Sequence, residues 1–269
     1  MYKILSIDLD GTLLNDNLKI SSANKKAIAH CLEKDIQIVL SSGRSADSMK
    51  PFIEELNLNQ YPFYASAFHG AYIFKTDTME PIKETSFNRI NALGILSNLK
   101  KNKEIGIVVY KGNNEALTED HNKNVKIYEN KVKIPIIEIK DYRNIKTDVL
   151  KIVVIGHSAN LKEVYNEFKY LNTTNDARTF YSNTNLLEFM SHIASKGTAL
   201  EYIAKASKIN MEETIGIGDN ENDISLVAAA KVGVAVNNAV DGLKEVADYI
   251  TEKTNDNNAV AEVIEKYIG

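Results

Sequence analysis

The sequence predicts an α/β protein built on a parallel β-sheet, with an α+β segment inserted into it. Near both ends of the chain, apolar runs typical of buried strands alternate with amphipathic helical patterns, and strand–helix–strand order indicates right-handed crossovers in a parallel sheet. Between the ends the pattern changes to mixed strands and helices with loops rich in Asn and Lys. We therefore expect a core domain formed by residues 1–82 and 191–269, and a separate domain at 83–190.

Size and composition are those of a globular protein with one large or two ordinary domains. The chain has 269 residues, of which 44% are hydrophobic, and a net charge of -4, which disfavours nucleic acid as a partner. A single cysteine, Cys31, excludes an intrachain disulfide and is predicted to fill the core. No apolar stretch approaches the ~20 residues that cross a bilayer. We expect a cytoplasmic protein without membrane partners, as a monomer or weak homodimer.

The N-terminal part of the chain is predicted to form two strands, each followed by a helix. Ile4, Leu5, Ile7 and Leu9 lie in an apolar run typical of a strand covered on both faces. A serine cap at Ser21 or Ser22 starts a helix up to residue 35, and "IQIVL" forms the next strand. A second helix is predicted over residues 46–56.

The inserted domain and the C-terminal part are predicted from shorter patterns. In the insert, helices are expected near residues 88–100 and 161–171, and strands at "IGIVVY", "VKIY", "VLKIVVI", "ARTFY" and "NLLEFM". The C-terminal part resumes the alternation, with helices at "KGTALEYIAKASKI", "ENDISLVAAA", "AVDGLKEVADYI" and "NNAVAEVIEKYI" and strands at "ETIGIGD" and "VGVAV". A last strand is expected after the third of these helices.

Polar groups stand where the predicted strands end, which is the edge at which open α/β sheets bind ligands. They are Asp8 with Asp10, Ser41 with Ser42, and Asp219 with Asp223; Lys196 opens a helix, and Gly43 and Gly197 allow close approach to an anion. At ~4 Å and an effective dielectric of ~20, two carboxylates repel by about 4 kcal/mol, so a positive charge or a shared proton is expected. Carboxylates with hydroxyls and a lysine suit Mg²⁺ bound beside a phosphate.

With these residues the chain resembles the haloacid dehalogenase superfamily, specifically the Cof-type phosphatases with an α/β cap inserted between their second and third motifs. "DLDGTLL" is similar to the first family motif, "SSGR" to the second, "SKGTAL" to the third and "GDNENDISL" to the fourth. The resemblance covers essentially the whole chain. It implies a Rossmann-like core with a mobile cap and hydrolysis of phosphate monoesters through an aspartyl-phosphate.

The resemblance also implies roles for individual residues. Asp8 would be the nucleophile and Asp10 the general acid and then base, so their environments should push their pKa values apart. The implied phosphate-binding residues are Leu9, Ser42, Gly43, Lys196 and Asn222. The implied Mg²⁺ site comprises Asp8, the Asp10 carbonyl, Asp219 and Asp223.

The sequence departs from the family pattern at two positions. Ser42 stands where threonine is more usual, and the hydroxyl is kept. In "SAFHGAYI", His69 stands where relatives usually have asparagine. His69 is either a neutral hydrogen-bonding substitute or an altered substrate contact. Further candidate substrate contacts are Arg44, Gly70 and Glu188.

We therefore expect a Mg²⁺-dependent phosphatase acting on small phosphorylated metabolites. Sugar phosphates are favoured as substrates, and pyridoxal phosphate and flavin mononucleotide are further candidates. Two alternatives share the motifs or their chemistry: a phosphosugar mutase, and a non-catalytic phosphate-binding or phospho-receiver module. Asp10 favours turnover over storage of a phosphoryl group, because a second acid beside the leaving oxygen is useful only for turnover.

Overall fold

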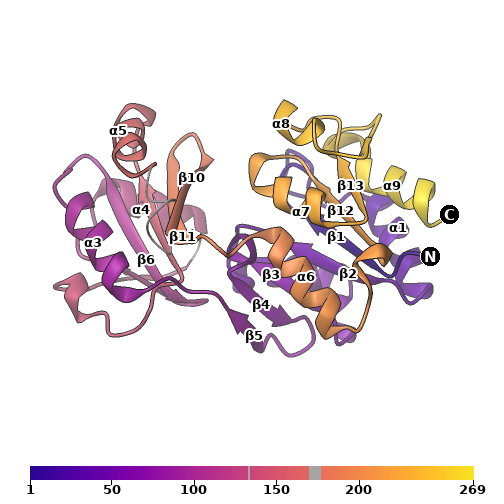
Figure 1. Cartoon of the computed structure of the whole chain (residues 1–269), viewed down its shortest axis with the longest axis horizontal. Coiled ribbons are helices and arrows are strands. Elements are labelled where there is room, and N and C mark those ends of the chain that lie inside the picture. Colours follow the sequence, from indigo (N-terminus) through magenta and orange to yellow (C-terminus); the bar gives the residue numbers. More distant parts are fainter. Residues whose placement is uncertain (133, 170–176) are drawn as a thin grey trace. The chain divides into compact units, whose positions relative to one another are not determined.

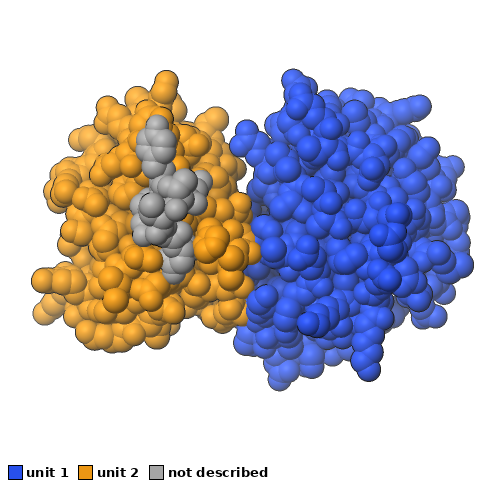
Figure 2. All heavy atoms as spheres, viewed as in Figure 1, with its two compact units in different colours: residues 1–83, 195–269 blue, residues 84–194 orange. Residues whose placement is uncertain are grey.

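The computed structural model describes residues 1–132, 134–169 and 177–269 (Figure 1). The chain divides into two compact units (Figure 2). Unit 1 comprises residues 1–83 and 195–269, and unit 2 comprises residues 84–194. Within the described ranges, every helix is too short or too polar to span a bilayer.

Unit 1 is built on an eight-stranded sheet with the order β14-β13-β12-β1-β2-β3-β4-β5. The central strand β1 pairs in parallel with β2 on one side and β12 on the other, and β3, β13 and β14 continue the parallel arrangement. Strand β4 turns back antiparallel to β3. The strands are β1 (Ile4–Asp8), β2 (Gln37–Ser41), β3 (Tyr64–Ala67), β4 (Tyr72–Lys75), β5 (Pro81–Glu84), β12 (Thr214–Gly218), β13 (Val232–Ala235) and β14 (Tyr249–Ile250).

Helices cover both faces of this sheet, since every residue of β1, β2 and β12 is buried. The helices are α1 (Ser22–Glu33), α2 (Ala46–Glu55), α6 (Lys196–Ala206), α7 (Ile224–Ala229), α8 (Asp241–Lys244) and α9 (Ala259–Tyr267). Leu200 and Ile203 of α6 and Leu226 of α7 pack in one apolar cluster with Ile4 and Val39 of the sheet. The predicted covered parallel strands and the serine cap of α1, which is Ser21, are confirmed.

Unit 2 has its own six-stranded sheet with the order β10-β11-β9-β6-β7-β8. Its strands are β6 (Gly106–Gly112), β7 (Glu115–Thr118), β8 (Ile136–Glu138), β9 (Lys151–Ile155), β10 (Ala177–Asn183) and β11 (Leu186–Ser191). Its helices are α3 (Arg89–Leu99), α4 (Lys123–Val132) and α5 (Ser158–Phe168). Ile95 of α3 and Leu161 of α5 share a buried cluster with Val109, Ile152 and Phe189 of the sheet.

The strand predicted at "VKIY" is wrong, because these residues lie in α4. Val125 and Tyr128 are buried while Ile127 is 56% exposed, which is the i, i+3 spacing of a helix face rather than the alternation of a strand. The helix predicted over residues 161–171 corresponds to α5, which ends at Phe168; residues 170 and 171 lie outside the described residues.

Candidate active site

The candidate site begins with three neighbouring parallel strands of unit 1. The register pairs Asp8 with Ser41 on β2, and Ile7 with Ile217 on β12. Ser42 and Asp219 directly follow the last residues of β2 and β12. Parallel strands bring their carboxyl ends to the same edge, so segments that are far apart in sequence deliver their polar residues to one place.

A buried lysine joins two of these carboxylates. Lys196, the first residue of α6, is 1% exposed, and its Nζ donates to Asp8 Oδ1 and to Asp223 Oδ1, both at 2.5 Å. Ser195 caps this helix by accepting from the Thr198 N–H, which fixes where the lysine side chain begins. The cluster therefore connects the end of β1, the start of α6 and the loop after β12.

Asp219 and Asp223 are held by the turn that follows β12. Asp223 Oδ2 accepts from the backbone N–H groups of Asp219 at 3.0 Å and Asn220 at 3.1 Å. Asp219 Oδ1 accepts from Thr12 Oγ1 at 2.8 Å. Carboxylate oxygens of Asp8, Asp219 and Asp223 lie within 4.8 Å of one another. An all-oxygen donor set of this kind fits a hard divalent cation.

The charge balance of this cluster is unfavourable for the carboxylates. Burial, followed by repulsion from Asp223, raises the pKa of Asp8 well above its usual value and raises the pKa of Asp219 to about 6. Burial acts to lower the pKa of Lys196, but Asp223 and Asp8 outweigh it and raise that pKa. For Asp8 this is opposite to the low pKa that a nucleophile needs, so the protein groups alone do not stabilise its ionised form. A bound cation would provide the positive charge that the cluster lacks.

We expect the EDTA-treated protein to become more stable as the pH is lowered from 7 to 5. An acid with a raised folded-state pKa stabilises the folded protein below its unfolded pKa, and this contribution is lost as pH rises through the folded value. For Asp219 the window runs from its usual 3.8 to about 6. Urea midpoints at pH 5, 6 and 7 measure the effect. Asp219→Asn should flatten the profile, and an equally steep profile in that variant would contradict this assignment.

Asp10 lies in a different environment from Asp8. Its side chain is 47% exposed and accepts two hydrogen bonds from Arg44, from Nε at 2.8 Å and from Nη2 at 2.6 Å. Arg44 also lies over the Phe52 ring, with Cζ 5.2 Å from its centroid. The two acids of the first motif therefore have separate cationic partners, Lys196 for Asp8 and Arg44 for Asp10.

The other predicted phosphate-binding residues lie near these groups. Ser42 is buried, and its Oγ accepts from the Arg44 N–H at 3.2 Å. The Leu9 side chain is fully buried, so any contact from Leu9 to a ligand would be through its backbone. The Asn222 side chain hydrogen-bonds to His69, whose ring lies beside Gly43.

Gly70 and Glu188 are the two remaining predicted substrate contacts. Gly70 follows His69, and its Cα lies against the backbone of Ser195. Glu188 belongs to unit 2, where it is buried on β11 and forms an ion pair with Lys151 at 2.9 Å. This ion pair of Glu188 thus lies within unit 2.

Thr12 and Asn238 were not among the predicted site residues. Thr12 orients Asp219, as described above, and Asn238 Nδ2 donates to the carbonyl of Gly11 at 2.8 Å. The "DGT" sequence placed Thr12 directly after the first-motif acids and could have suggested its contact. Asn238 carried no comparable signal, because it lies 227 residues from Gly11.

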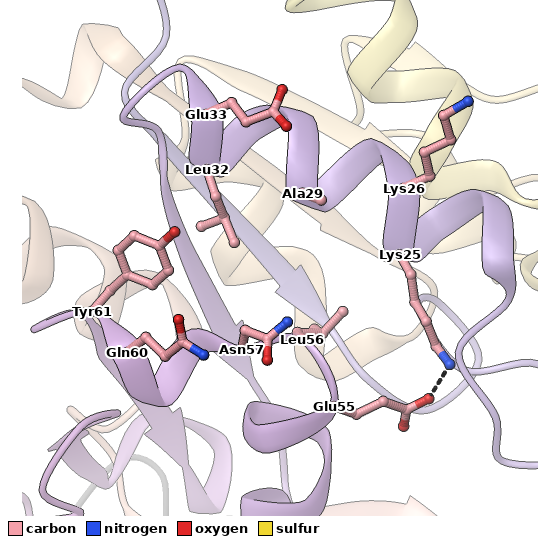
Figure 3. A pocket seen from close by; sticks show the side chains of 10 residues that line it. All are labelled: Lys25, Lys26, Ala29, Leu32, Glu33, Glu55, Leu56, Asn57, Gln60 and Tyr61. Atoms are coloured by element: carbon pink, nitrogen blue, oxygen red, sulfur yellow. Dashed lines mark ion pairs between the residues drawn. The ribbon is translucent and has the colours of Figure 1, made fainter.

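A surface hollow of about 560 Å³ lies elsewhere in unit 1, between α1 and the end of α2 (Figure 3). Leu32 and Leu56 contribute apolar lining, and Lys25 pairs with Glu55 at 2.5 Å. None of the predicted site residues lines it. The hollow is therefore separate from the acidic cluster.

The carboxyl ends of these parallel strands bring together three acids, a buried lysine and a buried serine hydroxyl. This arrangement is typical of enzymes that transfer or hydrolyse phosphoryl groups with the help of an acidic cluster. A family profile described as haloacid dehalogenase-like hydrolase matches residues 5–264. The chain belongs to this family. The predictions of a haloacid dehalogenase-type α/β fold and of a phosphatase-type hydrolase are thereby confirmed.

Individual proteins show the same relationship. The 5-amino-6-(5-phospho-D-ribitylamino)uracil phosphatase YcsE of Bacillus subtilis is 30% identical over 267 residues, covering 99% of this chain and 96% of its own. A crystal structure of a haloacid dehalogenase-like hydrolase from Bacteroides thetaiotaomicron matches with a TM-score of 0.86 and 30% identity, covering 99% of both chains. A structure described as a subclass IIB sugar phosphatase matches with a TM-score of 0.82 and 20% identity over 98% of both chains, which shows the fold.

Proposed function

We propose that the protein hydrolyses phosphate monoesters of small molecules, with Mg²⁺, through an aspartyl-phosphate on Asp8. The observation that carries the proposal is the buried cluster in which Lys196 bonds both Asp8 and Asp223, with Asp219 beside them. Phosphoryl transfer needs a nucleophile positioned in line with the leaving oxygen and cations around the phosphate oxygens. The cluster contains a residue suited to each of these roles.

In the proposed reaction an Oδ atom of Asp8 forms a bond to phosphorus while the bond to the leaving oxygen breaks. Asp10 gives its proton to that oxygen, then takes a proton from the water that attacks the aspartyl-phosphate, which releases phosphate and restores Asp8. The Arg44 contact holds both oxygens of Asp10. Asp10 must therefore leave or share this contact when it carries the proton.

We assign phosphate binding to Ser42 Oγ, the backbone of Leu9 and Gly43, Lys196 and Asn222. The Asp8 and Asp219 carboxylates and the Asp10 carbonyl would hold Mg²⁺, and Asp223 would support them. Bound Mg²⁺ would supply positive charge to the carboxylates and to the phosphate oxygens. Asp223 already holds the backbone of Asp219 in place, which suits a supporting role.

For the substrate we propose a phosphate ester of a polyhydroxylated molecule, with sugar phosphates favoured. The named substrate of the Bacillus subtilis relative carries its phosphate on a ribityl chain, and one structural neighbour is described as a sugar phosphatase. We further propose that residues 84–194 act as a cap that excludes water and selects the leaving group. Glu188 remains a candidate contact from that unit.

Removing divalent cations is expected to abolish phosphate release, because Asp8 and Asp219 then lack the charge that keeps them ionised. Excess EDTA should stop the reaction, and added Mg²⁺ should restore it. Asp219→Asn should raise the Mg²⁺ concentration that gives half-maximal rate. Release that persists in EDTA would contradict the proposed cofactor.

The same assay identifies the substrate class and tests the two alternatives. Phosphate release is measured over sugar phosphates, nucleotides, pyridoxal phosphate and flavin mononucleotide. Isomerised sugar phosphate in excess of free phosphate would indicate a mutase instead. A stable aspartyl-phosphate with negligible turnover would indicate a receiver module.

A further inference from the structure

The turn Phe68–Gly70, which joins β3 to β4, has an unusual backbone. Three consecutive residues have positive φ angles, 47° at Phe68, 52° at His69 and 98° at Gly70. Only glycine adopts this region without cost, so two non-glycine residues there are held by their surroundings. Phe68 and His69 are 1% and 4% exposed, respectively. The contacts of this buried turn show what holds it.

The turn is bound to the loop after β2, which carries Ser42. The His69 N–H donates to the Ser42 carbonyl and the Phe68 N–H donates to the Arg44 carbonyl, both at 2.9 Å. The His69 ring lies against Gly43: a Cβ at residue 43 would be 2.3 Å from its Cε1 and 2.4 Å from its Nε2. The ring therefore occupies the space that a side chain at residue 43 would need.

The same turn contacts the two other loops of the site. Asn222 Nδ2 donates to His69 Nδ1 at 3.1 Å. An amide nitrogen carries two N–H groups, so this bond orients Asn222 and leaves one donor for a ligand. A Cβ on Gly70 would be 2.0 Å from the Ser195 carbonyl, directly before Lys196. The turn thus touches the loops that carry Ser42, Lys196 and Asn222.

We propose that His69 is a positioning residue that fixes the phosphate-binding groups of Gly43 and Asn222 relative to each other. This inference rests on the proposed function, in which both groups bind the phosphate. The burial of His69 favours this positioning role over direct contact with the leaving group. Since the phosphate is common to all substrates, loss of the ring should lower kcat/KM by a similar factor for every substrate and should leave the order of preference unchanged.

Two substitutions separate the two contacts of the ring. His69→Ala removes both, and we expect kcat/KM to fall by roughly 10- to 100-fold, the range that is typical when hydrogen-bond partners of active-site metal ligands are removed. His69→Asn keeps an oxygen on Cγ where histidine has Nδ1, and asparagine tolerates positive φ. It should therefore keep the Asn222 bond and lose much less activity. His157→Asn, at an exposed position in unit 2, is the matched control.

A double-mutant cycle tests the contact with Gly43. Gly43 has no positive φ, and the nearest atoms to an added Cβ all belong to His69. Gly43→Ala should therefore lower both kcat/KM and the unfolding temperature in the wild-type background, and should lower them less in the His69→Asn background, where the outer ring atoms are gone. The inhibition constant of inorganic phosphate should rise in parallel with the loss of kcat/KM.

The outcomes separate this inference from the proposed function. Wild-type protein that releases no phosphate from any substrate would overturn the proposed function. If wild type is active, a His69→Ala variant with unchanged kcat/KM and phosphate inhibition would overturn the positioning role. So would a changed order of substrate preference, or a Gly43→Ala effect of equal size in both backgrounds. The unfolding temperatures of the double-mutant cycle can be measured without turnover. If Gly43→Ala lowered the unfolding temperature equally in the wild-type and His69→Asn backgrounds, the proposed contact between His69 and Gly43 would be overturned even in an inactive protein.

Discussion

Asp8→Asn is expected to lose phosphate release by roughly 10⁴-fold or more, the size of effect seen when a nucleophile is removed. The amide is a poor nucleophile, and the change removes one of the two anionic partners of Lys196. Asn has almost the same volume as Asp, so the buried end of β1 should remain packed. The measurement is steady-state phosphate release at saturating Mg²⁺, together with acid-quench trapping of the phosphoenzyme.

The matched control is Asp77→Asn, because Asp77 is exposed and its carboxylate accepts a hydrogen bond from the N–H of the neighbouring Thr78 at 2.8 Å. It should behave as wild type. Turnover that survives in Asp8→Asn, or a phosphoenzyme that still forms there, would remove Asp8 as the nucleophile and direct attention to another acid of the cluster.

Lys196→Met is expected to lose activity and also to destabilise the fold. The substitution leaves Asp8 and Asp223, both buried, without their shared cation. Removing one partner of a buried ion pair typically costs about 3–5 kcal/mol. The cost should be largest at pH 7 in EDTA and smaller at pH 5, because the raised pKa of Asp8 favours its protonated form as the pH falls. Urea unfolding at both pH values measures it.

Lys231→Met provides the comparison, because Lys231 pairs with Glu212 at 2.5 Å on the surface, where both side chains are largely exposed. Such pairs contribute little to stability, so this variant should unfold close to wild type. If the two lysine variants had the same urea midpoint, Lys196 would not be holding the acidic cluster together.

The sequence was sufficient to predict the elements that combine a long apolar run with a polar end. Asp8, Ser41 and Asp219 each follow or end such a run, and all three occur at the ends of neighbouring strands. The reason is general: a covered parallel strand must be apolar throughout, so the first polar residue marks the ligand-binding edge.

Other features depended on contacts that the sequence does not encode locally. The pairing of Arg44 with Asp10 joins loops 34 residues apart, and no spacing rule predicts it. "VKIY" was ambiguous because a run of four residues fits both the helical and the strand periodicity. The exposure of Ile127, between the buried Val125 and Tyr128, fits the helix. The positive φ of His69 was also hidden, because histidine usually has negative φ and its surroundings decide otherwise.

The insertion of residues 84–194 into unit 1 has a consequence for how the chain is made on the ribosome. Strand β1 can pair with β2 once about 40 residues have been synthesised. Its other neighbour, β12, begins only at Thr214. Unit 2 is contiguous and can fold while one edge of β1 is still open, since domains generally fold as units during synthesis. A message truncated just after residue 194 would therefore yield an unprotected strand edge, prone to aggregation. Asp8 would also lack Lys196, which lies beyond that point.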